Sequence, residues 1–198
     1  MDAVEAIRAG EPVLLPTDTV YGLACAADRA EPVHRMYALK GRAAAQPTAL
    51  LAASVDALLG LVPELDERAR AIARALLPGP FTLVLPNPAR RFPWLTGARP
   101  WTIGVRVAAL PEPAQRVLDA VVSVAATSAN EAGGRDPAAL DEVPEGVRRR
   151  CAAEIDAGRL PGTPSTVVDL TRADPLVLRE GAVSATETLA RIAHALDR

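Results

Sequence analysis

Short apolar runs alternate with longer amphipathic segments along the chain, and this alternation limits the fold more than any other feature. The runs have the length and composition of buried strands, whereas the segments between them repeat apolar residues at helical spacing. Strands interleaved with helices, with several strands in direct succession, predict a mixed α/β sheet. We expect strands at 13–15, 20–26, 49–53, 81–85, 102–107, 121–126, 166–170 and 176–178.

Capping and breaking residues mark the ends of the expected helices. Gly41 follows the segment 31–40, whose last residue is therefore placed at a helix C-terminus. A chain of 198 residues is long enough to bury one substantial core, so we expect residues 1–198 to form a single domain. We expect helices at 3–9, 31–40, 55–61, 65–77, 113–120 and from Ser184 onward, where Ser184 to Glu187 form a capping box.

The composition argues against several classes of protein. With 49% hydrophobic and 23% charged residues the chain is typical of a globular protein, and it contains no apolar run long enough for a membrane helix. A net charge of -2 argues against a protein whose main task is to grip nucleic acid. Cys25 and Cys151 lie far apart and only two histidines are present, so we expect neither a disulfide framework nor a zinc site. The first residues do not resemble a signal peptide, so we expect a cytoplasmic protein.

A polar turn follows the first expected strand. Pro16 cannot extend a central ladder, so the hydroxyl groups of Thr17 and Thr19 fall where the strand ends. Open α/β sheets bind their ligands at the ends of strands. The turn between residues 16 and 20 is therefore a candidate binding element.

Lys40 stands out because it is the only lysine among the 22 basic residues of the chain. A compact ammonium group can meet phosphate oxygens as a point charge, which a planar guanidinium group cannot do in the same way. A lysine at the end of a helix also complements the helix dipole, but an arginine would serve that purpose equally well. This pattern favours a functional role for Lys40 beside Arg42. Asn130 is similarly rare, since the chain contains only one other asparagine, Asn87.

Seven short motifs follow one another between the first strand and Gly181. They are PTDTVYGL from Pro16, Lys40-Gly41-Arg42, Pro78-Gly79-Pro80-Phe81-Thr82, Thr102-Ile103-Gly104-Val105-Arg106, Thr127-Ser128-Ala129-Asn130, Pro164-Ser165-Thr166-Val167-Val168-Asp169 and Leu178-Arg179-Glu180-Gly181. Together they resemble the YrdC/TsaC family of threonylcarbamoyl-AMP synthases in its single-domain form. One motif alone is weak evidence, whereas seven in order are specific. The resemblance implies a twisted, open, mixed sheet flanked by helices around a concave site.

The resemblance also implies an activity. Members of that family make threonylcarbamoyl-adenylate and pyrophosphate from L-threonine, bicarbonate and ATP, for the N6-threonylcarbamoyladenosine modification of tRNA. We therefore expect a nucleotidyltransferase that hands its product to separate tRNA threonylcarbamoyl transferase proteins and itself makes at most a weak contact with tRNA. Nucleotidyl transfer depends on positioning and charge stabilisation, commonly with Mg²⁺ bridging phosphates. We expect Mg²⁺ to enter with ATP and assign it no dedicated protein ligand.

Individual residues match the positions that carry function in the family. The characteristic catalytic set matches Lys40, Arg42, Ser128 and Asn130. The threonine-binding positions match Thr19, Tyr21, Arg106 and Ser165, and the planar fork of Arg106 suits a carboxylate. The nucleotide-binding positions match Lys40, Arg42, Gln46, Thr102, Ser128, Asn130 and Arg179.

Four residues depart from the family pattern. Gln46 stands where relatives often carry Asn or Lys, Leu51 stands where many longer relatives carry His, and Ala132 replaces a common Ser. Asp136 occupies a position where a Ser often touches the nucleotide. A carboxylate near phosphates repels them unless a metal ion intervenes, so Asp136 is the largest departure in chemical terms.

Two other functions fit part of the pattern. A YciO-like relative with another acceptor would share the fold and some of the motifs, although the segment from Ser128 to Asn130 favours the synthase. An RNA-binding module would use the concave face without chemistry, and the acidic charge balance speaks against it. Release of pyrophosphate from ATP, and its dependence on threonine, separates the three functions.

Overall fold

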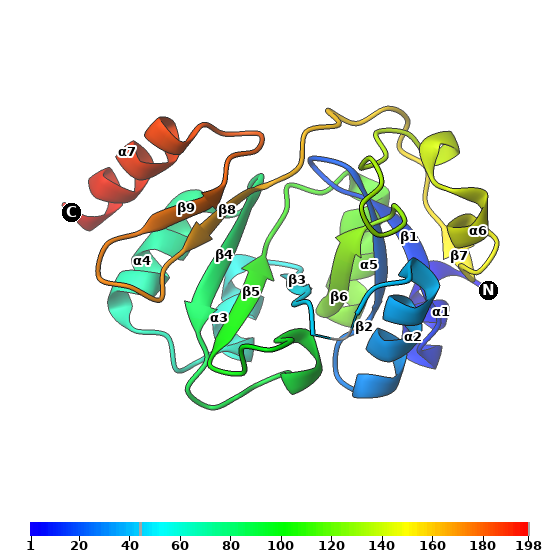
Figure 1. The fold of residues 1–198 in the computed structure, drawn as a ribbon, viewed down its shortest axis with the longest axis horizontal. Coiled ribbons are helices and arrows are strands. Elements are labelled where there is room, and N and C mark those ends of the chain that lie inside the picture. Colours follow the sequence, from blue (N-terminus) through cyan, green and yellow to red (C-terminus); the bar gives the residue numbers. More distant parts are fainter. Residues whose placement is uncertain (44, 198) are drawn as a thin grey trace.

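The computed structural model describes residues 1–43 and 45–197, and their strands form one mixed sheet (Figure 1). The order across the sheet is β7-β1-β2-β6-β3-β5-β4-β8-β9. Neighbours pair in parallel at β1–β7, β3–β5 and β4–β8, and antiparallel at the remaining positions. The strands are β1 (Val13–Pro16), β2 (Tyr21–Ala26), β3 (Ala49–Ala52), β4 (Phe81–Pro86), β5 (Thr102–Arg106), β6 (Ser123–Ser128), β7 (Ala153–Glu154), β8 (Thr166–Asp169) and β9 (Leu176–Arg179).

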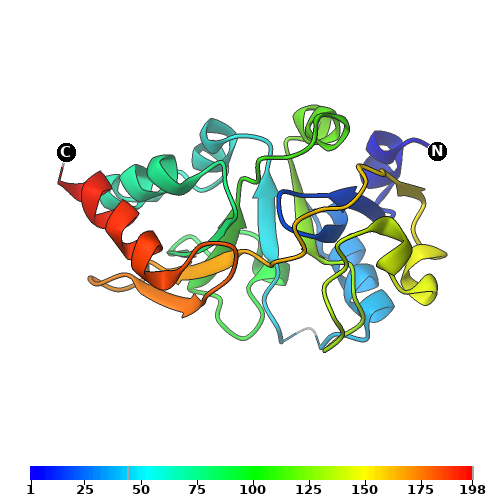
Figure 2. The same ribbon diagram turned by 90° about the horizontal axis from the view of Figure 1, so that it is seen from above.

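Helices flank this sheet, which confirms the predicted mixed α/β class. Figure 2 shows α1 and α7 at opposite ends of the molecule, with α4 beside α7 and α5 near α1. Two short 3₁₀ turns, η1 (Pro93–Leu95) and η2 (Leu140–Glu142), lie in the connections. The helices are α1 (Ala3–Ala9), α2 (Ala30–Lys40), α3 (Val55–Leu61), α4 (Glu67–Leu76), α5 (Glu112–Val121), α6 (Glu145–Arg148) and α7 (Ala185–Leu196).

The half of the sheet that contains β1 and β2 is covered on both faces. Leu14 and Leu23 belong to the same buried cluster as Met36 of α2, whereas Leu15 lies in a second cluster with Ile7 of α1. Successive residues of a strand point to opposite faces, so a run such as Val13–Pro16 must be apolar throughout. Burying each of these side chains contributes about 1.5–3 kcal/mol. This packing fixes the strands from which the polar turn after β1 extends.

The strand predicted at 121–126 lies two residues later, as β6 (Ser123–Ser128). Val121 is the last residue of α5, and Val122 adopts a positive φ of 67° between helix and strand. The apolar run thus serves two elements, which periodicity alone cannot separate. As a result, Ser128 lies within the sheet and pairs with Gly22 of β2.

The start of one helix and the presence of one strand also differ from the prediction. The helix predicted at 65–77 is α4 (Glu67–Leu76), because Asp66 caps it by accepting a hydrogen bond from the Ala69 N–H at 2.7 Å. The strand β7 was not predicted, since two residues are too few to give a pattern. The predicted domain ends at residue 198, which lies outside the described residues.

Candidate functional site

A cavity of about 390 Å³ is lined by residues of the sheet and of the segments that connect its strands. Its wall is formed by the turn after β1, the segment after α2, and residues of β2, β3, β4, β5, β6, β8 and β9. The loop residues Arg99, Asp136, Pro164 and Ser165 complete it. The structure therefore brings together segments that are far apart in the sequence. Of the residues predicted to bind or react, those in the wall are Thr19, Arg42, Thr102, Arg106, Ser128, Ser165 and Arg179.

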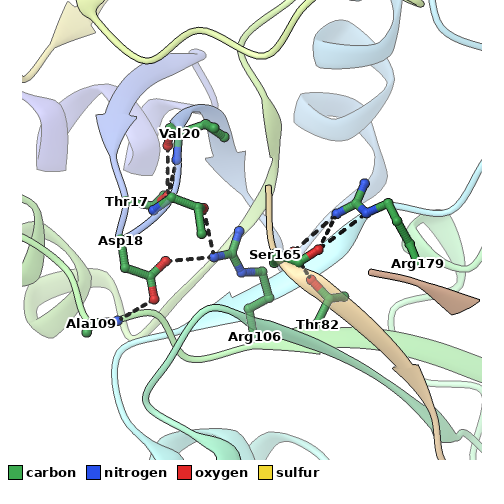
Figure 3. Close-up of polar contacts among 9 residues, drawn as sticks. Thr17, Asp18, Val20, Thr82, Arg106, Ala109, Ser165 and Arg179 are labelled. Atoms are coloured by element: carbon green, nitrogen blue, oxygen red, sulfur yellow. Dashed lines mark hydrogen bonds and ion pairs between the residues drawn. The ribbon is translucent and has the colours of Figure 1, made fainter. Parts of the chain in front are cut away.

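The turn after β1 is held rigid by the hydroxyl group of Thr17, which is buried (Figure 3). This oxygen accepts hydrogen bonds from the backbone N–H groups of Thr19 and Val20, each at 3.2 Å, and donates to the Val20 carbonyl at 2.7 Å. The Thr17 proton is thereby used, so the Thr19 hydroxyl is the donor in the 3.0 Å contact between the two side chains. Thr19 is left with lone pairs that face its cationic neighbour, Arg106.

Arg106, a residue of the wall, forms an ion pair with Asp18 beside it, with 2.9 Å between Nη2 and Oδ1 (Figure 3). Their side chains are only 13% and 10% exposed. The other oxygen of Asp18 accepts a hydrogen bond from the Ala109 N–H at 3.1 Å, and Arg106 also donates to the Thr19 hydroxyl at 3.3 Å. The guanidinium group is therefore held in one orientation.

Burial acts against the charge of both partners. It raises the pKa of Asp18, although Arg106 and the Ala109 N–H lower it, and burial lowers the pKa of Arg106, although Asp18 raises it. The Nε of Arg106 is buried and has no hydrogen-bond partner among the described residues. A buried donor without a partner costs about 1–3 kcal/mol.

Ser165 and Arg179 form a second polar group in the wall (Figure 3). The Ser165 and Thr82 hydroxyl groups lie 2.8 Å apart, because β4 and β8 are parallel neighbours. Arg179, at the end of β9, donates to the Ser165 carbonyl at 2.8 Å. Because the Ser165 carbonyl is neutral, this contact orients Arg179 without offsetting its positive charge, which remains available to an anionic ligand.

Lys40 is the last residue of α2, where Gly41 ends the helix in the left-handed conformation with φ 64°. Its side chain is buried behind the cavity wall, and its Nζ donates to the Ser128 carbonyl and, at 2.7 Å, to the Asn130 Oδ1. The Ser128 hydroxyl donates to the same Asn130 oxygen at 2.7 Å. Burial, together with a smaller effect of Arg42, lowers the pKa of Lys40 to about 8 against an opposing effect of Asp136. Three members of the predicted catalytic set are thus in direct contact.

Arg42, the fourth member, follows the turn at Gly41 and reaches the cavity. It donates to the Thr127 hydroxyl at 2.9 Å and to the Pro47 carbonyl, while its Nε is buried without a partner among the described residues. Burial lowers its pKa. Within residues 1–43 and 45–197, neither Arg42, Arg99 nor Arg179 pairs with a carboxylate, although all three line the cavity. Such an excess of positive charge in a concave site attracts polyanions.

Two predicted residues lie elsewhere. Tyr21 is fully buried and not part of the cavity wall, whereas its neighbour Gly22 is. Its hydroxyl donates to Asp156 or to the Gly158 carbonyl, each at 2.8 Å, and accepts from the Ala157 N–H. Adjacent residues of a strand face opposite sides, which explains the difference. Gln46 is exposed and also lies outside the wall.

Several residues in or beside the wall were not assigned a role from the sequence. Asp18 stood within the first motif, but its pairing with Arg106 joins residues 88 positions apart and had no local signal. Arg99 lies in the proline-rich loop between β4 and β5, where composition predicts only a surface. Thr17 and Thr82 support the wall through hydrogen bonds. Leu51, noted as a departure, contributes an apolar surface.

The described residues contain no group of three or more His, Cys, Asp or Glu side chains placed to hold a metal ion. In the same residues, no helix has both the length and the apolar character needed to span a membrane.

Comparison with known proteins places this fold and site in a family. Residues 5–181 match the model Sua5_yciO_yrdC, described as "Telomere recombination", and the chain belongs to this family. That result confirms the resemblance drawn from the seven motifs.

Particular relatives share most of this chain. A protein of Mycobacterium tuberculosis is 36% identical over 97% of this chain and 88% of its own length. The threonylcarbamoyl-AMP synthase of Pyrococcus abyssi is 36% identical over 91% of this chain. A crystal structure of P. abyssi Sua5 complexed with L-threonine superposes with a TM-score of 0.87, covering 96% of this chain and 56% of that one. This chain thus spans just over half the length of the archaeal relative.

Proposed function

We propose that this protein is an L-threonylcarbamoyladenylate synthase, a nucleotidyltransferase that forms threonylcarbamoyl-AMP and pyrophosphate from L-threonine, bicarbonate and ATP. The observation that carries the proposal is one cavity with two kinds of cation. Among the described residues, Arg106 is paired with a carboxylate, whereas Arg42, Arg99 and Arg179 are not. Relatives named threonylcarbamoyl-AMP synthase, 36% identical in P. abyssi and 30% in Bacillus subtilis, support it.

The amino acid binds at Arg106 in this proposal. Its carboxylate would meet the Arg106 guanidinium group, and the Thr19 hydroxyl and Ser165 would hold its other polar groups. Charge-assisted hydrogen bonds of this kind are the stronger ones, and the guanidinium fork fixes the orientation. Because Asp18 already orients Arg106, little conformational entropy remains to be lost on binding.

The nucleotide binds beside Lys40 and Arg42. The threonine amine and bicarbonate form a carbamate with loss of water, and a carbamate oxygen attacks the α-phosphorus of ATP. The bond from that phosphorus to the bridging oxygen breaks, and pyrophosphate leaves. Arg42, Arg179 and the Ser128 hydroxyl line the cavity where this charge is redistributed, and Thr102 lies in the same wall. Fixed donors of this kind stabilise developing charge without reorganisation.

Lys40 and Asn130 act from behind the wall. Their contacts hold the Ser128 carbonyl and hydroxyl in place, and the ammonium adds positive charge near the phosphates. Mg²⁺ bound with ATP would neutralise part of the phosphate charge. In this proposal Gln46, which is exposed and lies outside the wall, contacts the nucleotide from the edge of the site.

The product would pass to tRNA threonylcarbamoyl transferase proteins in the cytoplasm, with at most a weak direct contact between this protein and tRNA. A net charge of -2 supports a small-molecule enzyme over an RNA-binding module.

Pyrophosphate release from ATP and bicarbonate tests the proposal, measured with threonine, with serine and without an amino acid. We expect release that depends on threonine and a product with the mass of threonylcarbamoyl-AMP. Turnover without threonine would favour a YciO-like relative with another acceptor. Binding of tRNA without any turnover would favour an RNA-binding module.

A further inference from the structure

Asp136 is the single carboxylate in the cavity wall among the described residues, in a wall that contains four arginines. Hydrogen bonds to backbone carbonyl groups before and after Asp136 hold its loop in place. The Gly134 carbonyl accepts a hydrogen bond from the side-chain amide of Asn130, and the Pro137 carbonyl accepts one from the Tyr21 N–H at 2.9 Å. The loop that carries Asp136 is therefore tied to the Lys40–Asn130 cluster and to the start of β2.

The Asp136 side chain makes no hydrogen bond or ion pair with any residue in 1–43 or 45–197. This is unusual in a wall so rich in arginine, because a carboxylate gains most from a direct, bidentate contact. It nevertheless lies within electrostatic reach of Lys40, whose pKa it raises against the larger effect of burial. Asp136 thus faces the part of the cavity assigned to phosphates, with its oxygens free.

A free carboxylate at that position conflicts with phosphate binding unless a cation separates the two. Two charges of the same sign repel each other strongly when they are a few ångströms apart in a partly buried site. Mg²⁺ removes the conflict, since it is commonly bound by one or two carboxylates together with substrate phosphates and water. The described residues hold no all-protein metal cluster, which fits a metal whose remaining ligands come from the nucleotide.

We propose that Asp136 is the protein ligand of the Mg²⁺ ion that accompanies the nucleotide phosphates. This inference rests on the proposed function and extends it, because the sequence pattern assigned the metal no protein ligand. It also explains how this chain accepts a carboxylate where relatives often carry serine: the repulsion disappears once the metal is bound.

Equilibrium binding of a nonhydrolysable ATP analogue, measured by calorimetry, tests the proposal in wild type, Asp136→Asn and Asp136→Ser. With Mg²⁺ present, we expect both variants to bind the analogue about tenfold more weakly, in the range seen when a group that supports a metal is removed. In EDTA, without a metal ion, we expect the opposite order of affinities: both variants bind the analogue about fivefold more tightly than wild type. The substitution then removes a screened repulsion of about 1 kcal/mol between the Asp136 carboxylate and the phosphates. Asp174→Asn, an exposed carboxylate outside the wall, is the matched control and changes neither value.

Mn²⁺ in place of Mg²⁺ gives a second readout by electron paramagnetic resonance. The spectrum of the ternary complex of wild type with Mn²⁺ and the analogue should change in Asp136→Asn and stay unchanged in the control. Weaker binding of the variants both with and without metal would overturn the proposal and make Asp136 a hydrogen-bond acceptor for the nucleotide. Equal binding by all proteins would also overturn it. If wild type binds no nucleotide under either condition, the proposed function itself fails.

Discussion

Arg106 and Lys40 are both buried cations beside the same cavity, but the protein neutralises only one of them. Arg106 has Asp18 at 2.9 Å, whereas the Lys40 ammonium contacts neutral oxygens, the Ser128 carbonyl and the Asn130 amide. A cation that is already paired with a carboxylate of the protein is held in one orientation, and this orientation suits one small anion. A cation without such a partner keeps its charge for a ligand that brings several negative charges. In the proposed function, this difference separates an amino-acid subsite from a phosphate subsite.

The largest effect should come from Lys40→Arg. A planar guanidinium cannot reproduce the two contacts of the ammonium, so we expect kcat for threonine-dependent pyrophosphate release to fall about 100-fold or more, as when a charge-stabilising donor is lost. Thermal unfolding should show a smaller change, about 1–3 kcal/mol from overpacking. Arg116→Lys, in an exposed ion pair, is the control. Normal kinetics in Lys40→Arg would remove the special role of the lysine.

Arg106→Ala should act on the other subsite. We expect the KM for threonine to rise about 50-fold, because charge-assisted hydrogen bonds contribute about 1.5–3 kcal/mol. The KM for ATP should change less than about threefold, since the phosphates bind to other cations. Steady-state kinetics with each substrate varied in turn measures both values. Equal changes in the two KM values would contradict the assignment of Arg106 to threonine.

The pH dependence should report Lys40. Because burial lowers its pKa to about 8, the ammonium is charged below that pH and becomes neutral above it. We therefore expect kcat/KM for ATP, which reports the free enzyme, to fall about tenfold per pH unit above pH 8. The residual activity of Lys40→Arg should lack this decline, since a guanidinium stays charged. The same decline in that variant would assign the titration to another group.

Asp18→Asn should have a moderate effect on threonine alone. The amide keeps a similar shape but loses the charge that orients Arg106, so we expect the KM for threonine to rise about fivefold to tenfold, roughly the value of one such contact. In the Arg106→Ala background the same change should add little, because the two residues act together. Independent, additive effects in this double-mutant cycle would mean that Asp18 does not work through Arg106.

Tyr21→Phe should leave catalysis nearly unchanged. The lost hydroxyl bonds to Asp156, Ala157 and Gly158 outside the cavity, so we expect the unfolding free energy to fall by about 1–2 kcal/mol. The KM for threonine should stay within about twofold of wild type, in contrast to Asp18→Asn. A large rise would return Tyr21 to the amino-acid pocket, where the sequence pattern placed it.

The sequence predicts most of the fold because its strands are short apolar runs with clear breakers between them. It fails where one apolar run serves two elements, as at Val121 and Ser123, because periodicity carries no information on where a helix gives way to a strand. Pairing between distant strands likewise has no local signal.

The motifs identify the cations of the site but not their partners. The contact between Asp18 and Arg106 arises only when the turn after β1 meets the end of β5. Tyr21 shows the opposite limit: a residue can lie inside a functional motif and face away from the cavity, because strand alternation places its neighbour Gly22 in the wall instead.

A crystal structure with both L-threonine and a nonhydrolysable ATP analogue tests the central claim most directly. The account predicts the threonine carboxylate on Arg106 and Thr19, with the triphosphate beside Arg42, Ser128 and the buried Lys40. A nucleotide bound outside this cavity, or phosphates resting on Arg106, would contradict it.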